Sequence, residues 1–590
     1  MPAYIDSNPA ARRVRYQALA SALKVERQVG FDAHWKELGD YFMPRRTRFW
    51  TGDRNRGDKR NQNIIDSTGR FSARTLASGL HAGLTSPARP WMKLTTHNPE
   101  LAKQADVKQW LHEVSELMLT IFATSNLYNV LPIVYGDLGI FGTAAMAIIE
   151  DTRDVFRAYA FPTGSFALGQ DARGLVATFV REYQLTVRQV VEDYGVQPNG
   201  RDIDWSRISS AVHTAWNRGD YETTVDVCWM VKPNEMADPK KLGAKYLPFS
   251  SCHFELAGSP DVFLRESGYK TFPIMAPRWD ITGEDSYGTD CPGMTALGDN
   301  KQLQVMQKRK AQLLAKAVDP PLVGPSSLRT QKTSLMPGDI TYLDVREGMQ
   351  KLGPIHETRL EGFQHLSADV ADVQYRVQRA FYEDLFLMLA RSDAGRGSQP
   401  VTAREIDERH EEKLLALGPV LERTNDELLD PIVDRVYEMM DRAGLIPPPP
   451  ESLNGIELRV EYISILAQAQ KLVGVVGQDR FLQSTAALIG IEPTIAHKID
   501  WNQVVDNYAD MLGVDPKLVI PTDQAKATVA AAQQAMQAQQ QAEQNNLNAK
   551  SLEAASKAKL DNGDTALSRL VQNAGATMPT APQPPAGPPA

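Results

Sequence analysis

The sequence predicts an α+β protein in which an antiparallel sheet is followed by a long helical region, and three observations lead to this prediction. Apolar residues recur at helical spacing before the sheet, without a miss between Val107 and Phe122. From about Ala144 the apolar period changes to two, and turn clusters separate β-rich runs. Beyond Tyr287 the helical period returns in long segments.

Composition limits the classes of function. The chain has 590 residues, enough for several domains, and its 42% hydrophobic and 23% charged content is typical of a soluble protein. A net charge of −8 argues against a tight nucleic-acid binder, which usually has a strongly basic domain. The three cysteines provide no zinc knuckles and no disulfide framework, so we expect a reducing compartment. No apolar signal core follows Met1, so we expect cytoplasmic synthesis without signal-dependent export.

The first element expected is helical. Residues 9–43 predict one or two helices broken near Gly30, and a basic loop follows at 44–56. Its arginines alternate with Phe49 and Trp50, which could contact phosphates and bases. A solvated loop or a contact between subunits is the commoner explanation of such a pattern.

The segment 64–94 is rich in small residues and predicts a closely packed amphipathic helix. Its glycines suggest a phosphate loop, but no lysine follows them, and its charged residues exclude a membrane span. Asp66 or Ser67 can cap the helix. Glycine inside a helix costs stability, so we expect a neighbour to approach closely at Gly69, Gly79 or Gly83.

The sheet half is expected to be mostly antiparallel. A short helix near 187–194 interrupts it, and further strands are expected around 245–258, 261–268 and 272–279.

Two long helices flanking a β-forming insert come next. The first covers about 293–318, with five basic residues and no acid from Asn300 onward, and ends at Asp319-Pro320. The insert has several turn-forming prolines and glycines. The second helix covers about 362–390. This order predicts a helical hairpin with a β-containing tip.

The rest of the chain alternates flexible and helical composition. Residues 392–399 are rich in Gly and Ser, and a Thr402/Glu405 capping box starts a helix to Ala443 with a kink at Gly418-Pro419. More helix is expected to about Leu512. An Ala/Gln-rich segment and a Pro-rich end follow, and we expect the end to be disordered.

No catalytic pattern emerges from the sequence. There is no H-E-x-x-H and no G-x-S-x-G, and His112-Glu113 lacks the second ligand of a zinc protease. The acid pairs Asp202/Asp204 and Glu383/Asp384 are more commonly solvated surface than metal ligands. A site built from distant residues stays open, but we expect no enzyme, no cofactor and no metal site.

Four stretches in this order are similar to those of a known family. They are Asp66-Ser-Thr-Gly; Leu76-Ala-Ser-Gly-Leu with Leu84 to Trp91; Tyr287-Gly-Thr-Asp ahead of the first long helix; and Val401 to Ile406. Over roughly residues 10–510 the chain resembles the portal (head-to-tail connector) proteins of short-tailed bacteriophages. The resemblance implies a portal-protein fold that assembles as a dodecameric ring at a unique capsid vertex.

The resemblance also implies a division of the chain. The α+β wing would be 1–292, the stem helices 293–318 and 361–390, the clip 319–360 and the tunnel loop 391–401. A long kinked wing helix would be 402–443, a helical crown 444–522, and 523–590 a tail that is a helical barrel or disordered.

Candidate site residues follow from this division. The DNA-channel candidates are Arg391, Arg396, Lys301, Lys308, Arg309 and Lys316, and the candidates for docking on the clip are Arg329 and Lys332. The implied partners are double-stranded DNA read without sequence specificity, the terminase large subunit, capsid and scaffolding proteins, and tail adaptor proteins. No membrane is expected, and assembly would occur in the host cytoplasm.

Two alternatives stay open from the sequence. One is another virion structural protein, such as a tail adaptor or an internal core protein. The other is a DNA-processing enzyme of packaging, which would need a nucleotide loop or a carboxylate cluster.

Overall fold

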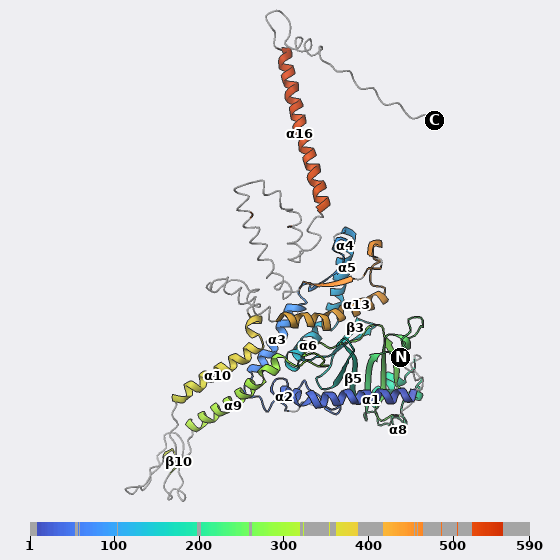
Figure 1. Cartoon of the computed structure of the whole chain (residues 1–590), viewed down its shortest axis with the longest axis vertical. Helices are drawn as coiled ribbons and strands as arrows, with labels where there is room; N and C mark the ends of the chain where they lie inside the picture. Colours follow the sequence, from blue (N-terminus) through green and yellow to red (C-terminus); the bar gives the residue numbers. More distant parts are fainter. Residues whose placement is uncertain are drawn as a thin grey trace, which may run out of the picture. The chain divides into compact units, whose positions relative to one another are not determined.

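The computed structural model (Figure 1) describes most of the first half of the chain and parts of the second. Two units result from its contacts, residues 1–487 and residues 488–590, and each is described by itself. The described residues are 9–53, 57, 59–102, 104–197, 202–258, 262–318, 322–323, 353–354, 361–387, 417–453, 455–456, 458–463, 485, 504 and 522–557.

The N-terminal helix is widened at Gly30, where a break was predicted. Helix α1 (Pro9–Arg27) continues through a π-helical turn (Gln28–Asp32) into α2 (Ala33–Tyr41), and the backbone stays right-handed on both sides of the turn. Arg27 donates to both carboxylate oxygens of Asp32, at 2.8 and 3.2 Å. This ion pair spans the extra residue of the wider turn, so the helix axis continues where composition alone indicated an end.

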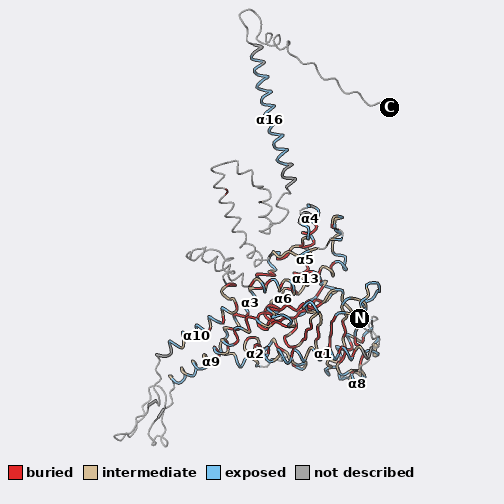
Figure 2. Tube along the Cα trace, viewed as in Figure 1, coloured by how far each residue is buried: buried red, intermediate tan, exposed pale blue. Residues whose placement is uncertain are grey.

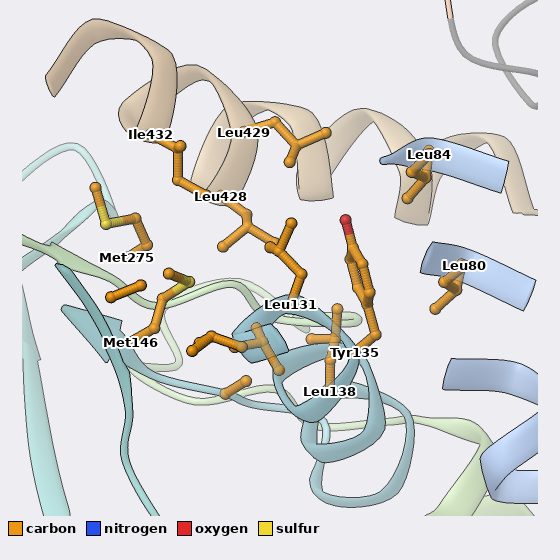
Figure 3. Packing of buried hydrophobic residues seen from close by; sticks show 14 of the residues in the cluster. Leu80, Leu84, Leu131, Tyr135, Leu138, Met146, Met275, Leu428, Leu429 and Ile432 are labelled. Atoms are coloured by element: carbon orange, nitrogen blue, oxygen red, sulfur yellow. The ribbon is translucent and has the colours of Figure 1, made fainter. Parts of the chain in front are cut away.

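Helix α6 lies at the centre of the body. Its bounds are Leu127–Phe141, and nearly all of its side chains are buried. Figure 3 shows Leu131, Tyr135 and Leu138 between the leucines of α3 (Thr68–Leu84) and those near residue 430. Gly139 lets α6 approach α3 closely, because a Cβ there would lie 2.4 Å from Leu76 Cδ2. The other helices before the sheet are α4 (Pro99–Ala102) and α5 (Ala105–Thr124), the latter as predicted.

The close approach predicted for α3 is confirmed at two of its glycines. A Cβ on Gly69 would lie 2.8 Å from the Phe42 ring, and one on Gly79 would lie 2.2 Å from the Phe386 ring. No single described helix is long and apolar enough to cross a membrane. Helices α5 and α6 reach that length and apolarity only as a pair bent by 79°.

The predicted antiparallel sheet is confirmed, as a five-stranded sheet of order β4-β5-β6-β7-β8. Alternate residues face different cores: Phe179 opposite Val231 faces the main core, whereas Val180 opposite Met230 packs with Tyr16 of α1. A second sheet has the order β3-β2-β9. The strands are β2 (Met146–Asp151), β3 (Val155–Ala160), β4 (Phe166–Gln170), β5 (Val176–Thr186), β6 (Thr224–Pro233), β7 (Phe249–Glu255), β8 (Arg265–Tyr269) and β9 (Ile274–Met275).

The helix predicted near 187–194 is present and begins with the capping box of Thr186 and Gln189. It consists of α7 (Val187–Val190) and a π-turn (Val191–Gly195), and it packs on a helix that was not predicted, α8 (Ser210–Arg218). Short 3-10 turns occur at Trp205–Arg207, Ala244–Tyr246 and Glu451–Leu453. Cys228, Cys252 and Cys291 are all buried and free.

In the C-terminal part of the body, one segment predicted to be helical is a strand. Residues 458–462, predicted to be helical, form β12 (Leu458–Tyr462) and pair antiparallel with β1 (Met92–Thr96). Trp91 stacks on Tyr462 with ring centroids 6.3 Å apart. The segment from 444, which the resemblance places in a helical crown, therefore contains a strand that pairs with the body.

The long helix predicted for 402–443 is described from residue 417. It is helical across Gly418-Pro419, and its irregularity is a π-turn (Asn425–Leu429) before α13 (Asp430–Arg442). The helix ends as expected near Ala443, where Gly444 takes a left-handed φ of +67°. Residues 402–416 lie outside the described residues.

The second unit contains α16 (Thr522–Lys557), which agrees with the helical alternative for the Ala/Gln-rich tail. Every side chain described on this helix is exposed (Figure 2).

Candidate channel helices and their junction with the body

Two helices form the hairpin predicted for the stem. Helix α9 (Pro292–Val318) lies beside α10 (Glu361–Ala380), and Leu303 packs against Val370 and Val373 (Figure 1). Beyond them, β10 (Leu322–Val323) pairs antiparallel with β11 (Gly353–Pro354). This ladder joins the two ends of the insert between the helices.

Burial divides α9 into two halves (Figure 2). Its buried residues all lie between Pro292 and Gln304, whereas Val305, Leu314 and Val318 are exposed by 58%, 46% and 79%. The first half is held in the body, and the second half presents apolar side chains to its surroundings.

Helix α10 ends earlier than predicted. The second stem helix was expected to reach residue 390, but Tyr382 has a left-handed φ of +55° and a new helical turn starts at residue 383. The turn lets Phe381 face Phe42, with ring centroids 5.4 Å apart, and seats Phe386 on Gly79. Packing against α3 therefore overrides the helical propensity of this segment.

The basic positions of α9 have unequal surroundings. Lys301 donates to Glu37 of α2 at 2.5 Å and lies 5.9 Å from the Tyr41 ring, and the hydrogen bond to Glu37 raises the pKa of Lys301. Lys308, Arg309 and Lys316 are exposed, and Arg309 reaches only Gln312, at 3.5 Å. Lys301 thus helps to fix α9 to α2, and the other three leave their charges to solvent. Arg391, Arg396, Arg329 and Lys332 lie outside the described residues.

The junction between stem and body centres on Asp66, which the sequence analysis treated only as a helix cap. Oδ2 of Asp66 accepts hydrogen bonds from Gln307 of α9 at 2.8 Å and from Gln374 of α10 at 2.9 Å. Its Oδ1 accepts the backbone N–H of Thr68 at 2.8 Å, at the start of α3. One carboxylate therefore joins three helices.

Gln304 completes this junction. Its side-chain oxygen accepts the backbone N–H groups of Ile65 and Asp66, both at 2.7 Å. Its amide nitrogen donates to the Asp66 carbonyl at 3.1 Å and to Asn300 at 3.0 Å. The amide is buried with all of these bonds made, so it fixes the position of α9 along its own axis as well as its distance from α3.

Asp66→Asn is expected to lower the free energy of unfolding by about 1–2 kcal/mol, since Asp66 is half-buried and loses charge-assisted hydrogen bonds. Partial burial favours the neutral acid, but the bonds from Thr68, Gln374 and Gln307 hold the pKa of Asp66 below its ordinary value. The stabilisation is therefore complete above the unfolded pKa of about 3.9 and is lost as the pH falls through the lower pKa of the folded protein.

Chemical unfolding at several pH values checks this prediction. The difference between wild type and Asp66→Asn should begin to shrink below about pH 4 and should disappear only when the pH is below the lowered pKa of Asp66 in the folded protein. Asp369→Asn, at an exposed position of α10, is the matched control and should have no effect. Equal losses in both variants, or a loss that persists in acid, would count against the role of Asp66.

The described residues contain no group of three or more His, Cys, Asp or Glu that could hold a metal ion. Of the acid pairs considered, Asp204 accepts Ser206 hydrogen bonds at 3.0 and 2.6 Å, and Glu383 accepts Ser72 Oγ at 2.7 Å. These carboxylates cap and link helices.

Comparison with known proteins identifies the family of the chain. The family model described as "Bacteriophage head to tail connecting protein" matches residues 13–520. The chain belongs to this family. Over 502 residues it is 45% identical to the portal protein of Salmonella phage epsilon15, covering 85% of this chain and 88% of the relative. Over 503 residues it is 43% identical to the probable portal protein of Bordetella phage BPP-1, with the same coverages.

Two solved structures are also similar in part. The neck of an empty gene transfer agent particle, computed with C6 symmetry, gives a TM-score of 0.33 at 11% identity, covering 76% of this chain and 91% of that one. The virion of a native gene transfer agent gives 0.33 at 12% identity, covering 75% and 91%. The family assignment is based on the sequence matches.

The portal family membership confirms the resemblance and decides between the alternatives. The function is that of a head-to-tail connector, a structural and non-enzymatic part of the virion, and the relatives are portal proteins and not tail adaptors or packaging enzymes. The matched residues end at 520, so α16 lies wholly beyond them.

Proposed function

We propose that twelve copies of this portal chain form a ring at the unique capsid vertex, with α9 and α10 lining a channel for double-stranded DNA. The observation that carries the proposal is the division of α9. The part up to Gln307 is fixed in the body through Lys301, Gln304 and the bond of Gln307 to Asp66, and the part beyond it is mostly exposed, basic and free of acids. Neighbouring copies would cover the exposed apolar residues of that part.

The charge of the chain suits a channel that lets DNA slide. Each phosphate neutralised by a cation adds affinity through counterion release, so an entirely basic bore would hold DNA in place. A net charge of −8 with a few basic positions gives weak, sequence-independent attraction instead. Lys308, Arg309 and Lys316 are the described candidates for this contact, and we extend the proposal to Arg391 and Arg396 of the tunnel loop 391–401.

The remaining segments complete the proposal. The insert at 319–360 would be the clip that docks the terminase large subunit and later tail adaptor proteins, with Arg329 and Lys332 as candidate contacts. Capsid and scaffolding proteins would contact the wing, and residues 444–522, apart from the strand at 458–462, would form the crown. Assembly would occur in the host cytoplasm.

Electron microscopy of the purified full-length chain tests the ring. Class averages computed without imposed symmetry should show closed rings with a central hole as wide as a DNA duplex. Monomers, open filaments or rings with a closed centre at micromolar protein concentration would contradict the proposal.

Replacing Lys308, Arg309 and Lys316 together by Gln is expected to leave ring formation intact and to weaken DNA contact. A plot of log affinity for DNA against log salt concentration has a slope set by the number of phosphates that the protein neutralises. The magnitude of this slope should fall by roughly 0.9 for each protein–phosphate contact that the substitutions remove. Filter binding of linear duplex DNA to purified rings over a salt series measures this slope. Lys301→Gln is the control, because Lys301 is paired with Glu37. An equal change in slope for this variant would show that DNA contact does not depend on where a cation lies along α9.

Truncation after Pro521 is expected to leave ring formation intact. It removes α16, whose described side chains are all exposed, and which lies beyond the residues matched by the family model. Its composition favours helix but provides few large apolar residues, so it contributes little to the fold of one subunit. Mass photometry of the truncated chain measures the outcome, and failure to form rings would show that the tail nucleates assembly.

A further inference from the structure

A basic pocket of ≈ 310 Å³ lies between α1, the loop after residue 44 and the sheet. The stem proposal assigns it no role. Its lining includes Lys24 and Arg27 from α1, Arg48 and Trp50 from the loop, and Arg181 from β5. These residues come from three separate stretches of the chain, so the fold, not a local motif, brings the charges together.

Two of the four cations are neutralised within the chain. Lys24 donates to Glu182 at 2.5 Å, and Arg27 pairs with Asp32 at 2.8 Å. No described carboxylate or hydrogen-bond acceptor meets the side chains of Arg48 and Arg181, and the Nε of each is buried without a partner. The pocket therefore holds two more positive charges than negative ones.

Arg181 is held in place without an anion. Its guanidinium lies 4.6 Å from the Phe161 ring and 5.0 Å from the Tyr183 ring. Burial lowers the pKa of Arg181 to about 10, the Tyr183 hydroxyl opposes this, and the charge of Arg48 adds to the lowering. Two neighbouring guanidinium groups with unmet donors are costly to keep in one chain, which indicates that an anion completes the site in the assembled protein.

The surroundings of the pocket identify the kind of anion. Trp50 at the pocket is 63% exposed, and Val25 and Val29, which follow the lining residues Lys24 and Gln28 in the chain, are 55% and 83% exposed. An exposed tryptophan in the lining of a charged pocket, with exposed valines next to lining residues on α1, fits a protein surface better than a free ion or a nucleic-acid backbone. Another copy of this acidic chain offers carboxylates for such a contact.

We propose that Arg48 and Arg181 together bind the carboxylate of an acidic side chain from a neighbouring copy of this chain, with Trp50, Val25 and Val29 packed around the contact. The inference rests on the proposed ring and names one of the surfaces that close it. A heterologous ring needs two different faces on every subunit, and this pocket would belong to the receiving face.

Assembly of the double variant Arg48→Gln with Arg181→Gln tests the charge requirement. Mass photometry of the full-length chain over a concentration series should show at least a tenfold higher concentration for half-assembly than in wild type. The unassembled subunit should stay folded and unfold at a temperature close to that of wild type, because no internal ion pair is lost and only the contacts of Arg181 with the Phe161 and Tyr183 rings are removed. The matched control replaces the exposed Arg173 and Arg188 by Gln and should assemble as wild type does.

A photoreactive amino acid at position 50 tests the partner. Mixed isotope-labelled and unlabelled copies should give a cross-link between two copies, to a peptide that contains Asp or Glu. Cross-links confined to one copy would overturn the inference.

Other outcomes separate this inference from the proposed ring. If wild type forms no ring at all, the proposed function itself fails. If wild type and the double variant assemble equally, only the carboxylate contact is wrong. Normal assembly with lost binding of duplex DNA would make the pocket a phosphate site. Unassembled double-variant subunits that are unfolded at the temperature of the assembly experiment would make the two arginines structural. Both results overturn the inference.

Discussion

Deleting residues 325–350 is expected to give rings that neither package DNA nor bind tail adaptors. The insert 319–360 as a whole contains few large apolar residues and several prolines, so it buries little surface within one subunit, and the loss of its central part should not unfold the body. The β10–β11 ladder, with Leu322 opposite Pro354 and Val323 opposite Gly353, lies outside the deletion. Gly324, Lys351 and Leu352 would remain between the strands, which is a usual length for a hairpin loop.

In vitro packaging by purified capsids that carry the variant ring measures this outcome, and electron microscopy shows whether the rings form. A milder variant, Arg329→Gln with Lys332→Gln, separates charge from shape: a smaller loss of packaging is expected. Wild-type packaging by the deletion variant would show that the motor docks elsewhere.

Gly293→Ala should destabilise the subunit by about 3 kcal/mol, as expected for severe overpacking. A Cβ on Gly293 would lie 2.4 Å from the Ile140 carbonyl oxygen and 2.7 Å from Ile140 Cα. These are backbone atoms of α6, the buried central helix, so relief requires α9 to move away from the core. The stem and the core are thus joined at a point with no room for a methyl group.

Gly298→Ala, in the same helix, is the matched control. A Cβ there meets nothing within 4 Å, and Ala is the better helix former, so this variant should gain about 0.5–1 kcal/mol. Chemical unfolding of both variants gives the comparison. Equal stability of the two would mean that α9 is not fixed against α6 as described.

The spacing of apolar residues predicted those helices and strands that bury one face along their whole length. Helix α5 and the strands of the five-stranded sheet follow from apolar spacing alone, since one face of each is buried. The structure differs from the sequence prediction where contacts with residues distant in the sequence determine the local conformation. Residues 458–462 extend because β1 offers an unpaired edge, and α10 turns at Tyr382 because Phe381 and Phe386 pack on distant residues.

The junction at Asp66 shows the same limit for function. The Asp66-Ser-Thr-Gly stretch was recognised, and an acid before a helix is a common cap, but nothing in its spacing points to Gln307 or Gln374. Lys301 and Lys308 recur on one helix face and looked equivalent, yet only Lys301 meets Glu37. A sequence pattern places a residue on a helix face, and the tertiary fold decides which neighbour that face meets.

The pairing of β1 with β12 has a consequence for how the chain is made. Strand β1 leaves the ribosome early, but its partner, residues 458–462, is synthesised only after the whole sheet, both stem helices and α13. Sheet strands β4 to β8 are close in sequence and can pair while translation continues, whereas β1 must wait with an open edge. An open strand edge is a template for pairing with other chains, so crowded nascent subunits are most exposed to misassembly during that interval. Closure of this last pair thus delays a finished body until residue 462 has emerged from the ribosome.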